Sequence, residues 1–183
     1  MTANIDTILD NFFERLMATT NQGNSLLIEY DDQWLSPCVK GEHRNGDLVP
    51  WEPSVQQRPL NFDNLARALE IKIPSQFETL FTRYWSDHVT VRSDEGELTL
   101  LQVWNSDDFE RLQQNLIGHV LMKRRLKQDD TLFFAITDQE DYIVSIECVT
   151  GFVVVERVGK APHKKLANSI GEFLEQLMPS NAS

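Results

Sequence analysis

The sequence predicts an α+β protein in which helices pack on a mainly antiparallel sheet. Short turns separate three apolar runs near the end of the chain, which makes neighbouring strands antiparallel. These runs are residues 131–137, 142–149 and 152–158. A further pair of alternating runs, 88–92 and 98–104, flanks a turn at residues 93–96 and predicts a β-hairpin. Residues 107–127 carry apolar side chains at helical spacing, so helices accompany the strands.

A length of 183 residues without repeats or low-complexity segments favours a single domain over residues 1–183. No apolar stretch is long enough for a transmembrane helix, and the N-terminus lacks the basic start and apolar core of a signal peptide. We therefore expect a cytoplasmic protein. Cys38 and Cys148 lie far apart without a C-x-x-C pattern, which favours buried free thiols in a reducing compartment.

Four other stretches have the periodicity of helices or begin with helix signals. An apolar stripe from Ile5 to Met17 predicts a first helix, capped near Thr2 or Asn4. The other three predicted helices are 62–69, 74–85, opened by a Ser75–Glu78 capping box, and a last helix from residue 163 or 164 to 177.

Residues 26–59 show weak periodicity and frequent Pro, Gly and Asp, which predicts loops with short strands near Val39 and Leu48. Trp51 stands between two prolines in this segment. Its ring either covers the core or serves as an aromatic anchor for a partner, and both interpretations stay open here.

The central helix follows a strand that ends at Trp104. Ser106 or Asp107 is the expected N-cap, and Asp107 and Glu110 have the spacing of a capping box. One apolar stripe is formed by Phe109, Leu112, Leu116, Ile117, Val120 and Leu121. Gly118 costs about 1 kcal/mol relative to alanine within a helix, so we expect it to permit a close contact with the sheet.

The sequence gives little support for catalysis or for a bound metal or cofactor. The four histidines fall on separate predicted elements, and no phosphate-binding loop, dinucleotide motif or nucleophile elbow is present. We expect His119 to be a hydrogen-bonded core residue. Asp107, Asp108 and Glu110 resemble an acid–base group, but carboxylates in a first helical turn favour capping and ionisation over a raised pKa.

The charge points to a class of partner. The net charge is −11, from 17 basic and 28 acidic residues. This disfavours nucleic acid and bare anionic lipid as partners, because phosphate groups attract basic surfaces. An acidic surface suits a basic protein partner, although many cytosolic proteins are acidic for solubility alone.

A run of short motifs resembles the Syd family, the SecY-interacting proteins of bacteria. It comprises Gln102-Val103-Trp104, Asp107-Asp108-Phe109, Gln114 to His119, Lys123, Leu126-Lys127, Thr131-Leu132-Phe133 and Glu172-Phe173-Leu174 with Leu177 and Pro179. The likeness extends upstream to Ser36-Pro37-Cys38, Trp51 with Pro53, and Glu70 to Pro74, and thus covers nearly the whole chain.

The resemblance implies a SUKH-type fold, a non-catalytic role and a partner, SecY, whose cytoplasmic loops are rich in Lys and Arg. It implies a peripheral position on the cytoplasmic side of the inner membrane, reached through that partner without lipid insertion, and a role in regulating or monitoring SecY complexes. The candidate partner-binding residues are Glu29, Asp31, Asp32, Trp51, Asp94, Glu95, Glu97, Trp104, Asp107, Asp108 and Glu110. Two alternatives remain: a SUKH-like immunity domain for another basic client, and a hydrolase that uses paired carboxylates.

Overall fold

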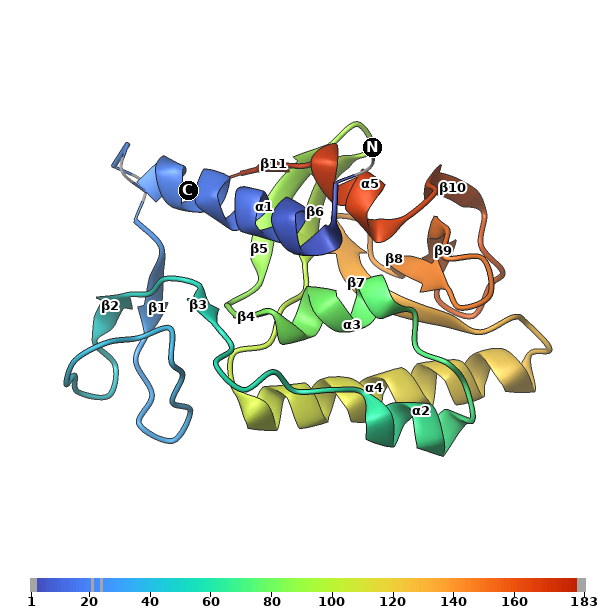
Figure 1. Ribbon diagram of the computed structural model, residues 1–183, viewed down its shortest axis with the longest axis horizontal. Coiled ribbons are helices and arrows are strands. Elements are labelled where there is room, and N and C mark those ends of the chain that lie inside the picture. The colour runs from blue at the N-terminus through green and yellow to red at the C-terminus, as the bar shows by residue number, and fades with distance from the viewer. Residues whose placement is uncertain (1–2, 21, 24, 181–183) are drawn as a thin grey trace.

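A curled antiparallel sheet with helices packed on it forms the body of the computed structural model, which describes residues 3–20, 22–23 and 25–180 (Figure 1). The strand order in the seven-stranded sheet is β10-β9-β8-β7-β6-β5-β11. Lys164 on the edge strand β10 forms an ion pair with Glu95 in the turn between β5 and β6, so the curl brings distant strands together. The predicted α+β class is confirmed.

The strands of the main sheet are β5 (Val89–Ser93), β6 (Gly96–Leu100), β7 (Thr131–Thr137), β8 (Tyr142–Glu147), β9 (Val153–Arg157), β10 (Lys164–Ala167) and β11 (Met178–Pro179). The predicted hairpin and meander are both confirmed, since β5 pairs with β6 in a register that sets Val91 opposite Leu98, and β7, β8 and β9 pair in sequence. Burial alternates along β5 and β6, whereas β7, β8 and β9 each have consecutive buried residues. All five strands contribute to one large core that extends from Ile8 to Leu177.

The helices are α1 (Ile5–Thr20), α2 (Asp63–Leu69), α3 (Ser75–Thr82), α4 (Ser106–Arg125) and α5 (Ile170–Glu175). In Figure 1, α3 lies between α1 and α4, while α5 lies beside α1 and α2 beside α4. The Asn4 carboxamide accepts the Asp6 N–H at 3.1 Å and caps α1, as predicted; the alternative, Thr2, lies outside the described residues. Two small sheets, β1 (Leu27–Glu29) with β2 (Leu48–Pro50) and β3 (Ser54–Val55) with β4 (Tyr84–Trp85), complete the fold.

The predicted last helix is wrong over its first half. Residues 164–167 form the edge strand β10 on β9, and α5 begins only after Ser169. The Ser169 hydroxyl accepts the Glu172 N–H at 3.1 Å, and the Glu172 carboxylate accepts the Asn168 N–H at 2.9 Å. This capping box fixes the start of α5, because it satisfies donors that a longer helix would use internally.

The predicted helix 74–85 is too long, and its capping box is wrong. Pro74 occupies the N-cap position without a side-chain bond, while Glu78 accepts the N–H of Phe62 at 3.0 Å. The carboxylate thus satisfies a buried donor at the start of α2. The helix ends at Thr82, because Tyr84 and Trp85 pair with β3.

The central helix α4 is confirmed, but its cap differs from the prediction. Asn105 is the N-cap and accepts the Asp108 N–H at 2.8 Å, and Asp108 in turn accepts the Trp104 N–H at 2.9 Å. The strand before α4 is shorter than the predicted run 98–104, since β6 ends at Leu100 and the Gln102 N–H donates to His88 Nδ1 at 3.0 Å.

The apolar stripe of α4 is confirmed in part. Leu116 and Val120 are fully buried, whereas Leu121 is 50% exposed. The expectation for Gly118 is wrong, since this residue is exposed and nothing approaches the position of a Cβ. In the loop segment, Leu48 lies in a strand as predicted, but Val39 lies in a turn.

Candidate functional site

A small second core fixes residues 26–51 to the start of α4. It contains Cys38, Trp51 and Trp104, and the two indole rings meet edge to face with centroids 5.8 Å apart. Trp104 Nε1 donates to the Trp34 carbonyl at 3.2 Å, and the Asn105 side chain donates to the Leu35 carbonyl at 2.9 Å. The buried rings and these two bonds hold the loop after β1 against α4.

The loop after β1 is closed by its own hydrogen bonds. The Asp31 carboxylate accepts the Gln33 N–H at 2.8 Å, and the Asp32 N–H donates to the Asn45 side chain at 2.7 Å. Hydrogen bonding by Gln33 and Asn45 holds the pKa of Asp32 below its ordinary value, so this carboxylate is charged at neutral pH. Exposed carboxylates are therefore presented by an ordered loop.

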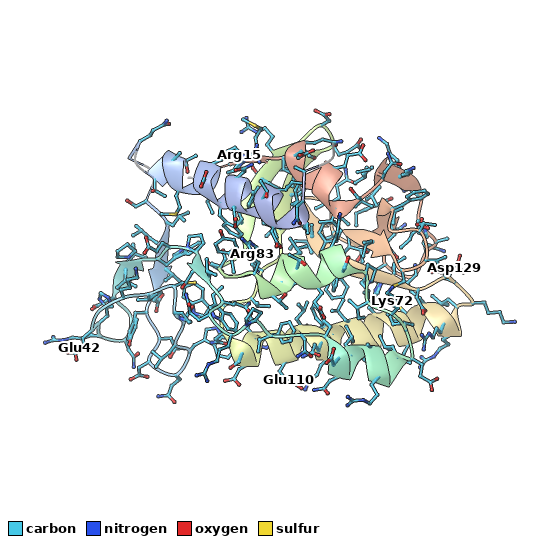
Figure 2. All side chains as sticks on the ribbon, in the orientation of Figure 1. Arg15, Glu42, Lys72, Arg83, Glu110 and Asp129 are labelled. Atoms are coloured by element: carbon cyan, nitrogen blue, oxygen red, sulfur yellow. The ribbon has the colours of Figure 1, made fainter. Side chains whose placement is uncertain are left out.

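Six of the predicted acidic residues lie on the two segments that meet at this end of the molecule, which we call the acidic end. Its residues are Glu29, Asp31, Asp32, Asp107, Asp108 and Glu110. The first three lie on or just after β1, and the others lie in the first turns of α4, which the second core holds beside that loop. Figure 2 places Glu110 along α4 and Glu42 at the tip of the loop beyond β1 and β2.

The six carboxylates are not equally free. Asp108 is half-buried and caps Trp104, whereas Glu29, Asp31, Asp32, Asp107 and Glu110 are exposed. Among the described residues, none of the ion pairs involves any of the six. The Arg111 guanidinium also lies in this region, 4.9 Å from the ring centre of Trp34.

A cavity of about 270 Å³ lies in the acidic end. Aromatic and aliphatic side chains line it together with two carboxylates. The lining comprises Ile28, Glu29, Tyr30, Asp31, Trp34, Leu35, Ser36, Val39, Gly41 and Trp104. Such a combination can accept an apolar or cationic side chain, because the aromatic faces and the carboxylates both attract cations.

The other three predicted acidic residues lie elsewhere. Asp94, Glu95 and Glu97 belong to the β5–β6 hairpin, whose turn is at the opposite end of β6 from Trp104 (Figure 1). Glu95 is bound to Lys164, and Glu97 faces Arg92 across the hairpin. These residues form no common surface with the acidic end.

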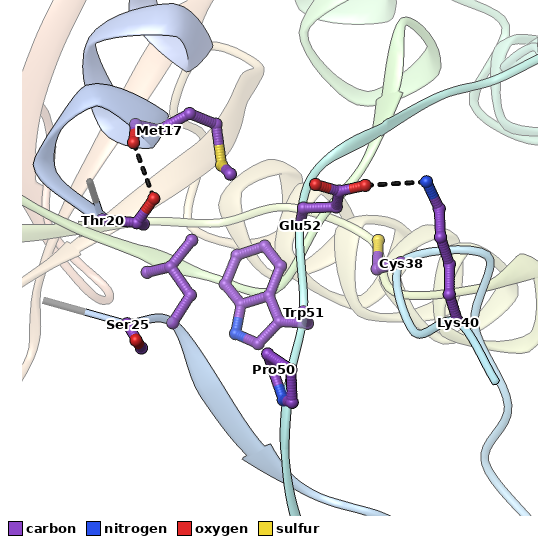
Figure 3. Close-up of a pocket in the computed structure, with 9 residues that line it drawn as sticks. Met17, Thr20, Ser25, Cys38, Lys40, Pro50, Trp51 and Glu52 are labelled. Carbon is purple, nitrogen blue, oxygen red and sulfur yellow. Dashed lines mark hydrogen bonds and ion pairs between the residues drawn. The ribbon is translucent and has the colours of Figure 1, made fainter. Parts of the chain in front are cut away.

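Trp51 is only 6% exposed, which confirms its interpretation as core cover. It still forms one wall of a second cavity, of about 320 Å³, with Leu26, Met17 and Cys38 (Figure 3). Lys40 and Glu52 close one side of this cavity through an ion pair of 2.8 Å. Burial raises the pKa of the Cys38 thiol to about 11, which leaves it protonated and unreactive at neutral pH.

The described residues contain no group of three or more His, Cys, Asp or Glu side chains placed to hold a metal ion. His119 is a buried structural residue, as predicted, with Nε2 2.9 Å from the Thr131 hydroxyl. The pKa of Asp10 is lowered by its bond to Arg83, the opposite of what a general acid needs.

Within the described part of the chain, no helix is long and apolar enough to cross a membrane.

A buried ion pair beneath α4 was missed by sequence reasoning. Lys123 Nζ lies 2.6 Å from Glu156 Oε1, and each side chain is 1% exposed. The signal for Lys123 was its position, three residues after Val120 on the apolar stripe of α4. Glu156 offered a similar signal, because it directly follows the apolar run Val153–Val155 in β9.

Together, the fold and the site define a class: an α+β domain that presents carboxylates on an ordered, open surface. Comparison with known proteins is more specific, since the family described as Syd protein (SUKH-2) matches residues 4–179. The chain belongs to this Syd family.

Relatives named Protein Syd match over most of their length. The protein from Alteromonas mediterranea is 45% identical over 182 residues, covering 100% of this chain and 98% of the relative. The relative from Pseudoalteromonas atlantica is 38% identical, with 98% of both chains covered, and that from Colwellia psychrerythraea is 45% identical over 87% of this chain and 84% of its own.

Proposed function

We propose that the protein binds the cytoplasmic face of SecY, the channel subunit of the translocon, through its acidic end, and thereby regulates or monitors SecY complexes. The observation that supports the proposal is the contact between the loop after β1 and the start of α4, two segments that carry six carboxylates in a chain of the Syd family. In this proposal the protein acts from the cytoplasm and reaches the inner membrane through its partner alone.

Electrostatics supports this pairing. Cytoplasmic loops of membrane proteins carry an excess of Lys and Arg, and a protein of net charge −11 attracts them. Attraction of this kind raises the association rate and weakens with salt, since the Debye length is only about 8 Å at physiological ionic strength. The cavity in the acidic end, of about 270 Å³, is smaller than the roughly 300–1,000 Å³ of small-molecule pockets, which favours a side chain of a protein partner over a small metabolite.

The most direct test reverses charges that serve no structural role. Glu29 and Glu110 are exposed, and no ion pair between described residues uses them. Glu29→Lys with Glu110→Lys should slow association with purified SecY complexes in nanodiscs and reduce the salt dependence of binding. Because each exposed pair contributes about 0.2–1 kcal/mol, we expect an affinity loss of roughly two- to thirty-fold for the double variant.

The matched control reverses Glu140, which is exposed in the turn between β7 and β8, near the β5–β6 end of the sheet. Glu140→Lys alters net charge by the same amount per site but should leave binding nearly unchanged. Thermal melts check that all variants fold. If the acidic-end variant binds SecY complexes with the affinity and salt dependence of the parent, the proposed site is wrong.

If the partner is a basic protein other than SecY, a pull-down experiment should give a different result. Immobilised protein would then retain a cytosolic partner but no component of solubilised membranes, and the same Glu29 and Glu110 reversals would release that partner. Recovery of SecY from membranes, with loss on charge reversal, supports the present proposal instead.

A further inference from the structure

The two-stranded sheet β1–β2 has one apolar face that no other part of the described chain covers. Its register sets Leu27 opposite Pro50 and Glu29 opposite Leu48, which places these four side chains on one side. All four are exposed, with Leu27 at 46% and Leu48 at 67%. Leu27 and Leu48 are diagonal neighbours on this surface, which we call the ribbon face.

The opposite side of the same sheet is packed. Val49 is 3% exposed, and Ile28 packs on the Trp51–Trp104 core. The Trp51 N–H donates to the Leu26 carbonyl at 3.0 Å and extends the pairing by one residue. The ribbon face is therefore held on a fixed support, and its exposure does not result from a strand that is loosely attached.

The surroundings of the ribbon face are negatively charged. Residues 27–50 contain five carboxylates and two basic side chains. Of the two basic residues, Lys40 is already paired with Glu52. Glu29 lies within the face itself, opposite Leu48, and Asp47 directly precedes β2. A ligand that covers the leucines must also meet these carboxylates.

We propose that the ribbon face binds a cationic apolar peptide segment, in which aliphatic or aromatic side chains alternate with Lys or Arg. This class of ligand is complementary to the ribbon face. Its apolar side chains would cover Leu27, Leu48 and Pro50, and its Lys or Arg side chains would pair with Glu29 and the neighbouring carboxylates. The inference rests on the proposed function, which it extends by assigning the partner loop an apolar component beside its basic residues. The acidic end then sets the association rate, while the ribbon face slows dissociation.

Two synthetic peptides of equal charge separate the apolar from the ionic contribution. One alternates Lys with Leu, and the other alternates Lys with Ser. The full-length parent should bind the Lys/Leu peptide more tightly, and the Leu27→Ser/Leu48→Ser variant should lose about tenfold in affinity for it, as expected when buried apolar contact is removed. Its affinity for the Lys/Ser peptide and its salt dependence should equal those of the parent.

Leu126→Ser is the matched control, because Leu126 is 47% exposed and lies after the far end of α4. It should bind both peptides as the parent does. Equal binding of the Lys/Leu peptide by parent and Leu27→Ser/Leu48→Ser overturns the inference, as does equal binding of the two peptides by the parent.

The same variants in the SecY nanodisc assay keep the two proposals apart. If the leucine variant binds SecY complexes like the parent while the Glu29 and Glu110 reversals weaken binding, the proposed function survives and the ribbon face is not used there. If the charge reversals have no effect either, both proposals fail.

Discussion

Removal of one partner from the buried Lys123–Glu156 pair should be among the most damaging single changes in the protein. Lys123→Met preserves much of the side-chain length but leaves the Glu156 carboxylate under α4 without its cation. Glu156 Oε2 already has no hydrogen-bond donor among the described residues, which increases the cost of an uncompensated charge.

The magnitude follows from the burial. Both side chains are 1% exposed and their charged atoms are 2.6 Å apart, so screening by water is weak. Breaking such a pair from one side costs about 3–5 kcal/mol, against a total stability of about 5–15 kcal/mol for a typical domain. The Lys123→Met/Glu156→Met double variant removes both charges and should recover most of this loss, because apolar replacement of a buried pair is often neutral.

Urea unfolding followed by far-UV circular dichroism gives the free energy of unfolding for the parent, both single variants and the double variant. The sum of the two single losses should exceed the loss of the double variant by several kcal/mol. A loss below about 1 kcal/mol for Lys123→Met would refute the reasoning, since it would mean that water reaches the pair.

Leu116→Ala should cost about 2–5 kcal/mol in urea unfolding, because Leu116 is fully buried, and a loss below about 0.5 kcal/mol would contradict its place in the core. Burial lowers the pKa of His119 below its ordinary 6.5, an effect that Lys123 strengthens and Glu156 opposes. As the pH falls, the unfolded chain therefore takes up this proton before the folded protein does, and the free energy of unfolding should decrease below about pH 6.5. His119→Gln should flatten this pH dependence of the free energy of unfolding. Flotation with protein-free anionic vesicles at physiological salt should leave the protein unbound, and stable co-flotation would reject binding through a protein partner alone.

Local patterns accounted for the elements whose neighbours in sequence are also neighbours in space. The β5–β6 hairpin and the β7–β8–β9 meander were predictable because alternating runs meet at short turns, and α4 because its stripe extends over three turns and more. For residues 164–167 the predicted helix was wrong. Leu166 has the helical spacing to Ile170 and Phe173, but pairing with β9 makes this segment a strand. The Ser169–Glu172 capping box was the overlooked signal for the start of α5.

The candidate site depended on contacts that no local pattern encodes. The two segments that carry the six carboxylates meet because Trp34 and Leu35 bind Trp104 and Asn105, about seventy positions away in the chain. The hairpin carboxylates looked equivalent in sequence, yet Glu95 is bound by Lys164 across the curl of the sheet. The Lys123–Glu156 pair joins a helix to a strand 33 residues later, so neither residue identifies the other in advance.

The two outer strands of the main sheet have a consequence for aggregation. An exposed strand edge offers unpaired N–H and C=O groups that invite another chain to pair. At one edge, β11 is only two residues long and contains Pro179, which has no N–H to donate. At the other, β10 carries Lys164 and Lys165, and its register shifts between Lys165 and Ala167. Short length, proline, lysine and a bulge all discourage edge-to-edge pairing, so we expect this sheet to resist growth into intermolecular β-structure even at high protein concentration.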